Sequence, residues 1–262
     1  MHTVEILNKT YYPQAEWNEL SARQVIYLCR QLTKKISASL IKKKIAFRFA
    51  KIPVILYARR LNRIQQMQIE NLYDFLFEKS ALTNNPLPSV RIGLRMYYGP
   101  EDKCKNIMVD EFVHAFYAYQ AFKKTQKPEH LDKLIAILWR PTNPWIRFVG
   151  FLNGRDIRAK FNDRKLKVSI KKISAMPEAF KLAALLFWSG FENSLPNDFP
   201  LVFKLLEKHS LATESANWPD VIIELSGQKH GKPAEIEQMN FRNFAYILNK
   251  QEVDRIKAEK NK

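Results

Sequence analysis

Apolar residues recur with the period of an α-helix along most of the chain, most clearly over residues 110–141. Phe112 and Phe116 belong to an apolar stripe at positions i, i+3, i+4 and i+7, and leucine and isoleucine repeat that spacing further on. A short Lys/Pro turn separates the two segments. Pro128 suits the first turn of a helix, and Pro141 is expected to end it. The stretch predicts a helical hairpin.

Weaker stripes of the same period flank this hairpin. Ser21 with Gln24 forms a capping-box pattern, so a helix is expected to begin at residue 22. Gly190 is expected to end the helix over residues 177–190. Further helices are expected after residue 195, and the predicted helical ranges before it are 22–32, 38–51, 53–64, 66–79, 163–175 and 177–190.

The segments without helical period complete the predicted architecture. Residues 3–12 alternate as a short strand or β-hairpin, and residues 80–109 and 141–162 are expected to form long ordered loops, the first able to hold a strand over 90–97. The fold class is therefore mainly α: a multi-helix array with a short N-terminal β element. A small polar stretch at 212–217 predicts a division between a basic helical body (1–211) and a C-terminal helical subdomain (212–262).

Composition excludes several classes of protein. Seven glycines in 262 residues argue against Gly-rich phosphate loops, and the two cysteines form no paired motif. The longest apolar run, residues 182–188, is far shorter than the ~20 residues of a membrane span. No signal peptide is expected at the N-terminus. These features indicate a soluble protein of a reducing compartment.

The net charge of +17 is unevenly distributed. Residues 20–69 hold twelve Lys/Arg and no acid, and residues 155–172 hold eight Lys/Arg against two acids. Such runs either bind an anionic partner or form solvated helix faces. If nucleic acid is the partner, the candidate phosphate contacts are Lys42, Lys43, Lys44, Arg59, Arg60, Arg63, Arg155 and Arg158.

The aromatic residues of the second loop allow two interpretations. Trp145, Phe148 and Phe151 surround Arg147, a pattern that can bind a partner. The same residues can instead hold the loop against the core. They are the candidate partner-binding residues.

The sequence contains no recognisable catalytic motif. The adjacent pair Asp110-Glu111 would diverge by ~100° on a helix and suits a helix N-terminus. His114 is interpreted as a surface histidine and Cys29 as a core residue. The chain is therefore expected not to be an enzyme, with no cofactor and no metal.

Several phrases together resemble uncharacterised helical proteins encoded in the tail-morphogenesis regions of bacteriophages and prophages. They extend from WNELSARQ at residue 17 through DEFVHAFYAYQAF and LDKLIAILWRP to EIEQMNFRNFAYIL. The closing Trp-led helix, short break and aromatic helix are similar to those of tail-assembly chaperones, which keep the tape-measure protein soluble before the tail tube polymerises. The resemblance covers roughly residues 14–250.

Two hypotheses follow. The first is a non-enzymatic phage-type morphogenesis protein, a tail-assembly chaperone or virion connector component, that binds another phage structural or tail protein in the bacterial cytoplasm or the virion. The alternative is a sequence-tolerant nucleic-acid-binding protein that uses the basic runs over 20–69 and 155–172. Neither hypothesis involves a membrane.

Overall fold

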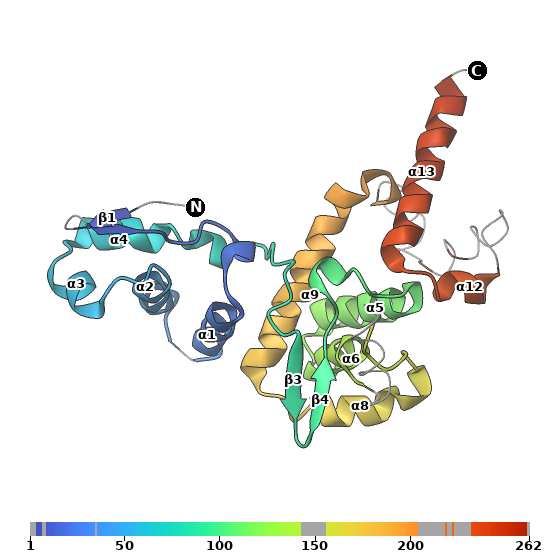
Figure 1. Ribbon diagram of the computed structural model, residues 1–262, viewed down its shortest axis with the longest axis horizontal. Helices are drawn as coiled ribbons and strands as arrows, with labels where there is room; N and C mark the ends of the chain where they lie inside the picture. Colours follow the sequence, from blue (N-terminus) through green and yellow to red (C-terminus); the bar gives the residue numbers. More distant parts are fainter. Residues whose placement is uncertain are drawn as a thin grey trace. The chain divides into compact units, whose positions relative to one another are not determined.

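The computed structural model in Figure 1 describes residues 4–6, 9–34, 36–142, 156–203, 218, 222 and 232–260. The chain forms two compact units: unit 1 comprises Met1–Leu87 and Pro177–Asn193, and unit 2 comprises Pro88–Met176 and Ser194–Lys262. Helices dominate, and the sheets are small and antiparallel, which confirms the predicted mainly α fold.

Unit 1 begins with a β-hairpin, and short helices follow. Its strands pair with Val4 opposite Tyr11. Its elements are β1 (Val4–Ile6), β2 (Lys9–Tyr11), α1 (Ala22–Leu32), α2 (Ala38–Phe49), α3 (Val54–Arg59), α4 (Arg63–Asn71), 3-10 turns at Trp17–Glu19 and Asp74–Phe77, and most of α9 (Glu178–Asp198).

The capping box of α1 is confirmed. The Ser21 hydroxyl accepts a hydrogen bond from the Gln24 backbone N–H at 3.3 Å, and the Gln24 side chain accepts from the Ser21 backbone N–H at 2.9 Å. These two bonds satisfy donors that a helix end otherwise leaves unpaired. On the inner face of this helix Cys29 is fully buried, as predicted.

The predicted helices over 53–64 and 66–79 have different boundaries in the structure. Asn62 interrupts the first because its side chain accepts from the Gln65 backbone N–H at 2.9 Å and so starts α4 as a new helix. The second prediction is also too long, since the 3-10 turn at Asp74–Phe77 follows the end of α4. Asn62 therefore separates two short helices, α3 and α4, within the first predicted helical range.

Helix α9 continues through Gly190, so the prediction that this glycine ends the helix is wrong. A Cβ atom at Gly190 would overlap the backbone of Leu82, and close approach is therefore the reason for glycine here. Nearby, the Asn193 side chain donates to the Ser80 carbonyl oxygen at 2.9 Å, and the Ser80 hydroxyl donates to the Leu186 carbonyl oxygen at 2.8 Å.

Unit 2 contains a three-stranded antiparallel sheet of order β3-β4-β5 and the predicted helical hairpin, α5 and α6. The β3–β4 hairpin lies within the segment predicted as a loop over 80–109 and turns at Gly93, which has φ of 59°. Its elements are β3 (Ser89–Ile92), β4 (Arg95–Tyr98), a 3-10 turn at Asp102–Cys104, α5 (Val109–Thr125), α6 (Pro128–Leu138), β5 (Arg140–Pro141), a 3-10 turn at Asp163–Lys165, α8 (Leu166–Ile173), α12 (Pro233–Glu237) and α13 (Phe241–Lys260).

The C-terminal helices of unit 2 pack on the start of α5. The ring of Phe112 stacks on Phe241 with centroids 3.6 Å apart and meets Trp218 edge-on at 5.0 Å. The Val109 backbone N–H donates to the Met239 carbonyl oxygen at 2.9 Å. Residues after 232 thus share unit 2 with the central hairpin. The predicted division at residue 212 lies outside the described residues.

None of the helices in the described part of the chain combines the length and the apolar character that crossing a bilayer demands.

Candidate functional site

The six basic residues predicted from the first run lie on three consecutive helical segments of unit 1. Two of them are neutralised by acids that follow the acid-free run. Lys42 pairs with Asp74 at 2.5 Å, and Arg63 pairs with Glu70 at 3.2 Å. Glu70 is buried and also accepts a hydrogen bond from the Tyr57 hydroxyl at 2.9 Å. Lys42 and Arg63 are therefore weaker candidates for phosphate contacts.

The other four predicted residues are available to a partner. Lys43, Arg59 and Arg60 are exposed and Lys44 is half-buried. None of the four forms an ion pair with another described residue. We call Lys43, Lys44, Arg59 and Arg60 the α2–α3 basic surface.

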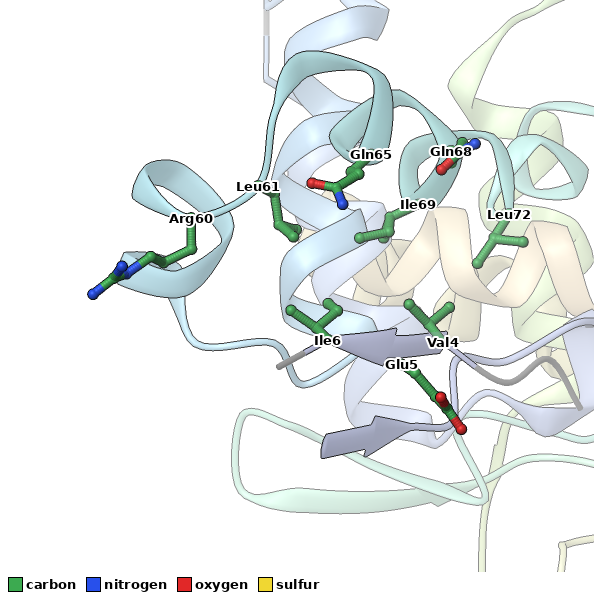
Figure 2. A pocket seen from close by; sticks show the side chains of 9 residues that line it. All are labelled: Val4, Glu5, Ile6, Arg60, Leu61, Gln65, Gln68, Ile69 and Leu72. Carbon is green, nitrogen blue, oxygen red and sulfur yellow. The ribbon is translucent and has the colours of Figure 1, made fainter. Parts of the chain in front are cut away.

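A pocket of about 410 Å³, with Arg60 among its lining residues, lies between β1 and α4 (Figure 2). Its walls are mixed, with apolar Ile6, Leu61 and Ile69 beside polar Gln65 and Gln68. Figure 2 shows that the Arg60 side chain points away from the other lining residues. Arg60 therefore presents its charge to solvent rather than to the pocket.

The prediction that Arg158 contacts nucleic acid is wrong, because Arg158 is only 3% exposed. Its guanidinium donates to the carbonyl oxygens of Leu138 and Asn106, at 3.1 and 2.8 Å. It also pairs with Asp156 at 2.8 Å. The other predicted residues of this region, Arg155, Trp145, Phe148 and Phe151, lie outside the described residues.

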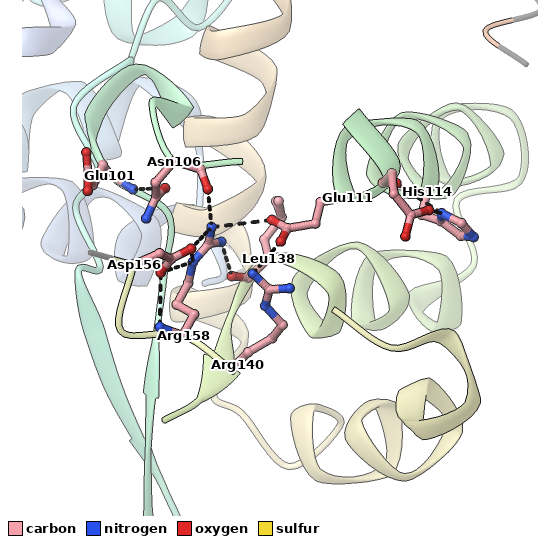
Figure 3. Close-up of polar contacts among 9 residues, drawn as sticks. Glu101, Asn106, Glu111, His114, Leu138, Arg140, Asp156 and Arg158 are labelled. Carbon is pink, nitrogen blue, oxygen red and sulfur yellow. Dashed lines mark hydrogen bonds and ion pairs between the residues drawn. The ribbon is translucent and has the colours of Figure 1, made fainter. Parts of the chain in front are cut away.

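Arg158 belongs to a charged network that we call the Glu111 cluster: the buried residues Glu111, Arg140 and Arg158 and the half-buried Asp156 (Figure 3). Glu111 Oε1 lies 2.7 Å from Arg140 Nη2, and its Oε2 lies 3.3 Å from Arg158 Nη2. One carboxylate thus holds two arginines. In Figure 3 they approach it from β5 and from the segment after residue 155.

The two arginines have pKa shifts in opposite directions. Burial lowers the pKa of Arg140, the Glu111 carboxylate opposes this change, and the positive charge of Arg158 adds to it. Burial also acts on Arg158, but Glu111 and Asp156 together outweigh it and raise the pKa of Arg158. The difference follows from the number of carboxylates at each guanidinium.

The sequence prediction missed Glu111 and Arg140. Its place beside Asp110 at the start of a helix indicates only an N-terminal charge for Glu111. Glu111 precedes Ala115 by four residues and Ala118 by seven, and both alanines are buried. The helical period therefore places the Glu111 side chain on the same inner face of the helix. That spacing was the available signal, whereas nothing local marks Arg140.

Asp110, the residue before Glu111, pairs with His114 rather than with an arginine. His114 Nδ1 lies 2.8 Å from the Asp110 carboxylate and 3.0 Å from the Asp110 carbonyl oxygen. The hydrogen bond to Asp110 raises the pKa of His114 although burial opposes the shift. His114 is half-buried, with its ring 5.0 Å from that of Phe161.

The described residues offer no group of three His, Cys, Asp or Glu side chains that could hold a metal ion. Cys29 and Cys104 are buried, and burial raises the pKa of Cys29 to about 12, so neither is an activated thiol.

No family model matches the chain, and neither a curated protein nor a solved structure matches it.

Replacing Glu111 tests whether the cluster stabilises unit 2. Glu111→Ala leaves Arg140 and Arg158 buried without their shared carboxylate, and we expect the free energy of unfolding to fall by about 3–5 kcal/mol. The control Asp110→Ala removes a half-exposed carboxylate and is expected to cost about 1 kcal/mol or less. Urea unfolding followed by circular dichroism measures both. Equal losses for the two variants would contradict a stabilising role.

The Asp110–His114 pair predicts a pH dependence. A raised folded-state pKa means that the pair stabilises fully below the unfolded pKa of histidine, about 6.5, and that this stabilisation is lost as pH rises through the folded-state pKa. The free energy of unfolding of wild type should therefore be higher than that of His114→Gln, and this difference should be larger at pH 5.5 than at pH 8.5. Urea unfolding at both pH values measures the difference, and a pH-independent difference would refute the assignment.

Proposed function

We propose that the protein is a non-enzymatic, sequence-tolerant nucleic-acid-binding protein that uses the α2–α3 basic surface. The observation that carries the proposal is the availability of Lys43, Lys44, Arg59 and Arg60. These four residues make no ion pair within the described part of the chain and lie in a run of fifty residues, 20–69, without one acid.

Free lysine and arginine side chains suit phosphate groups for an electrostatic reason. Each contact with a phosphate releases condensed counterions, which favours binding at low salt and weakens it steeply as salt rises. Arg59 and Arg60 can also bind phosphate oxygens bidentately. Contacts of this kind fix position on the backbone and do not read bases, so binding is expected to tolerate sequence.

The direct test is the affinity for a labelled duplex and a labelled single strand across a salt series. We compare wild type with a variant in which all four residues of the α2–α3 basic surface are replaced by Gln. For the duplex, the slope of log affinity against log salt should decrease in magnitude by about 0.9 for each phosphate that the variant no longer binds. Fluorescence anisotropy measures the affinities.

A matched control separates local contacts from net charge. Arg91, Arg95, Lys124 and Lys127 are exposed residues of unit 2, and their replacement by Gln removes the same number and types of positive charge. The control variant should keep the wild-type slope. Equal slopes in all three proteins, or no binding near physiological salt, would contradict the proposal.

A second candidate is a phage-type morphogenesis protein that binds another tail or virion protein in the host cytoplasm or the particle. The observation that favours it is a set of exposed apolar side chains on α3 and α4. Ile55 is 71% exposed and Ile64 is 69% exposed, and Met67 follows Ile64 at helical spacing. An amphipathic partner helix would cover such residues. The resemblance to tail-assembly proteins points to the tape-measure protein as that partner.

Replacing Ile64 tests this second candidate. Ile64→Glu places a charge on the exposed apolar position and should reduce the affinity for a purified tape-measure segment about tenfold, since it removes apolar burial and adds a desolvation cost. The control Leu94→Glu alters a side chain that is 92% exposed in unit 2 and should leave binding unchanged. Isothermal titration calorimetry measures both, and equal affinities for wild type and Ile64→Glu would contradict this candidate.

A further inference from the structure

The pocket between β1 and α4 shares a residue with the α2–α3 basic surface. Arg60 lines the pocket, and Arg60 and its exposed neighbour Arg59 are two of the four cations of that surface. The pocket volume of about 410 Å³ lies within the ~300–1,000 Å³ of small-molecule sites. Pocket and surface both belong to unit 1. A ligand could therefore occupy the pocket and meet an arginine at the same time.

Aliphatic side chains form two opposite walls of the pocket. Val4 and Ile6 lie on the same face of β1, because alternate residues of a strand share a face. Figure 2 shows them directed towards Leu61, Ile69 and Leu72. A flat ring placed between the two walls would bury both of its faces against aliphatic groups, which favours a planar ligand.

Two glutamines supply the polar groups of the pocket. The Gln65 side-chain oxygen accepts from the Asn62 backbone N–H at 3.0 Å, which leaves its NH₂ group without an acceptor among the described residues. Gln68 is exposed, and its amide forms no hydrogen bond with another described residue. A neutral amide offers both a donor and an acceptor. The polar edge of the ligand is therefore expected to carry hydrogen-bonding groups and no charge.

The two charged residues of the lining do not point between the aliphatic walls. In Figure 2 the Arg60 side chain points away from the other lining residues. Glu5 is exposed and points away from Val4 and Ile6, since it lies on the opposite face of β1. The part of a ligand inside the pocket should therefore be uncharged, whereas a negative charge outside it would meet Arg60.

We propose that this pocket receives one unpaired base of a single-stranded nucleic acid. The base lies between the aliphatic walls, its edge forms hydrogen bonds with the amides of Gln65 and Gln68, and its backbone phosphate pairs with Arg60. Every base has two apolar faces and an edge with hydrogen-bonding groups, so the contact tolerates sequence. A duplex would first have to unstack and unpair the base. The inference rests on the proposed function and deepens it, because it names the single strand as the preferred form.

The probes are a labelled oligothymidylate and a labelled abasic strand of the same length. They carry the same number of phosphates, so contacts with the α2–α3 basic surface are equal and only the base differs. The full chain should bind oligothymidylate about tenfold more tightly at the same salt concentration, the lower end of what burying one base supplies. Fluorescence anisotropy measures both affinities.

Two variants connect this affinity ratio to the pocket. Val4→Trp fills the space between the walls and should bring the ratio close to one without changing the affinity for the abasic strand. Gln68→Ala removes an exposed amide and should lower the ratio about threefold, the effect of one hydrogen bond. The matched control Asn71→Ala removes an exposed amide of α4 that does not line the pocket, and it should keep the wild-type ratio.

Methyl NMR of isoleucine-labelled protein locates the base. The δ1-methyl resonances of Ile6 and Ile69 should shift with oligothymidylate and not with the abasic strand, and Ile6→Val and Ile69→Val identify them. Equal wild-type affinities for the two strands, or a ratio that neither Val4→Trp nor Gln68→Ala lowers, would overturn the pocket assignment while leaving phosphate binding intact. Binding of neither strand would overturn the proposed function, and this inference with it.

Discussion

The buried carboxylate of Glu111 is the constraint on which unit 2 depends. Removing a carboxylate and two guanidinium groups from water is expensive, and the cost is recovered only when every charge has its partner at close range. Because Arg140 and Arg158 come from segments distant in the chain from α5, the three segments must meet for any one of these charges to be tolerated. The ion pairs therefore specify how these three segments are arranged. Apolar residues of similar size could supply the same stability, but they would not specify this arrangement.

The two units use their charged residues in different ways. In unit 1 the acids that follow the basic run bind within the unit, Glu70 to Tyr57 and Arg63, and Asp74 to Lys42. Lys43, Arg59 and Arg60 face solvent, where salt screens them. In unit 2 the ion pairs of Glu111 with Arg140 and Arg158 are buried, and screening affects them little. Binding at the α2–α3 basic surface should therefore depend on ionic strength.

Both proposed functions of unit 1 can use neighbouring parts of the same helices. Arg59 and Arg60 suit an anionic backbone, and Ile55 and Ile64 suit an apolar helix face. A protein partner that carries both acidic and apolar residues would use the two sets together, whereas nucleic acid would use the cations alone. The distinction is physical, because apolar contact is insensitive to salt and phosphate contact is not.

The sequence by itself determined the local features. The period of the apolar stripes placed the α5–α6 hairpin, and the Ser21–Gln24 pattern placed the start of α1. The acid-free run pointed to candidate phosphate contacts, of which Lys43, Arg59 and Arg60 are exposed. These features depend on residues a few positions apart, so spacing reveals them. Only the tertiary structure decided the rest: Gly190 allows close approach to Leu82, and Arg158 is buried and shares Glu111 with Arg140. Those outcomes depend on contacts between residues far apart in the chain, which no local pattern specifies.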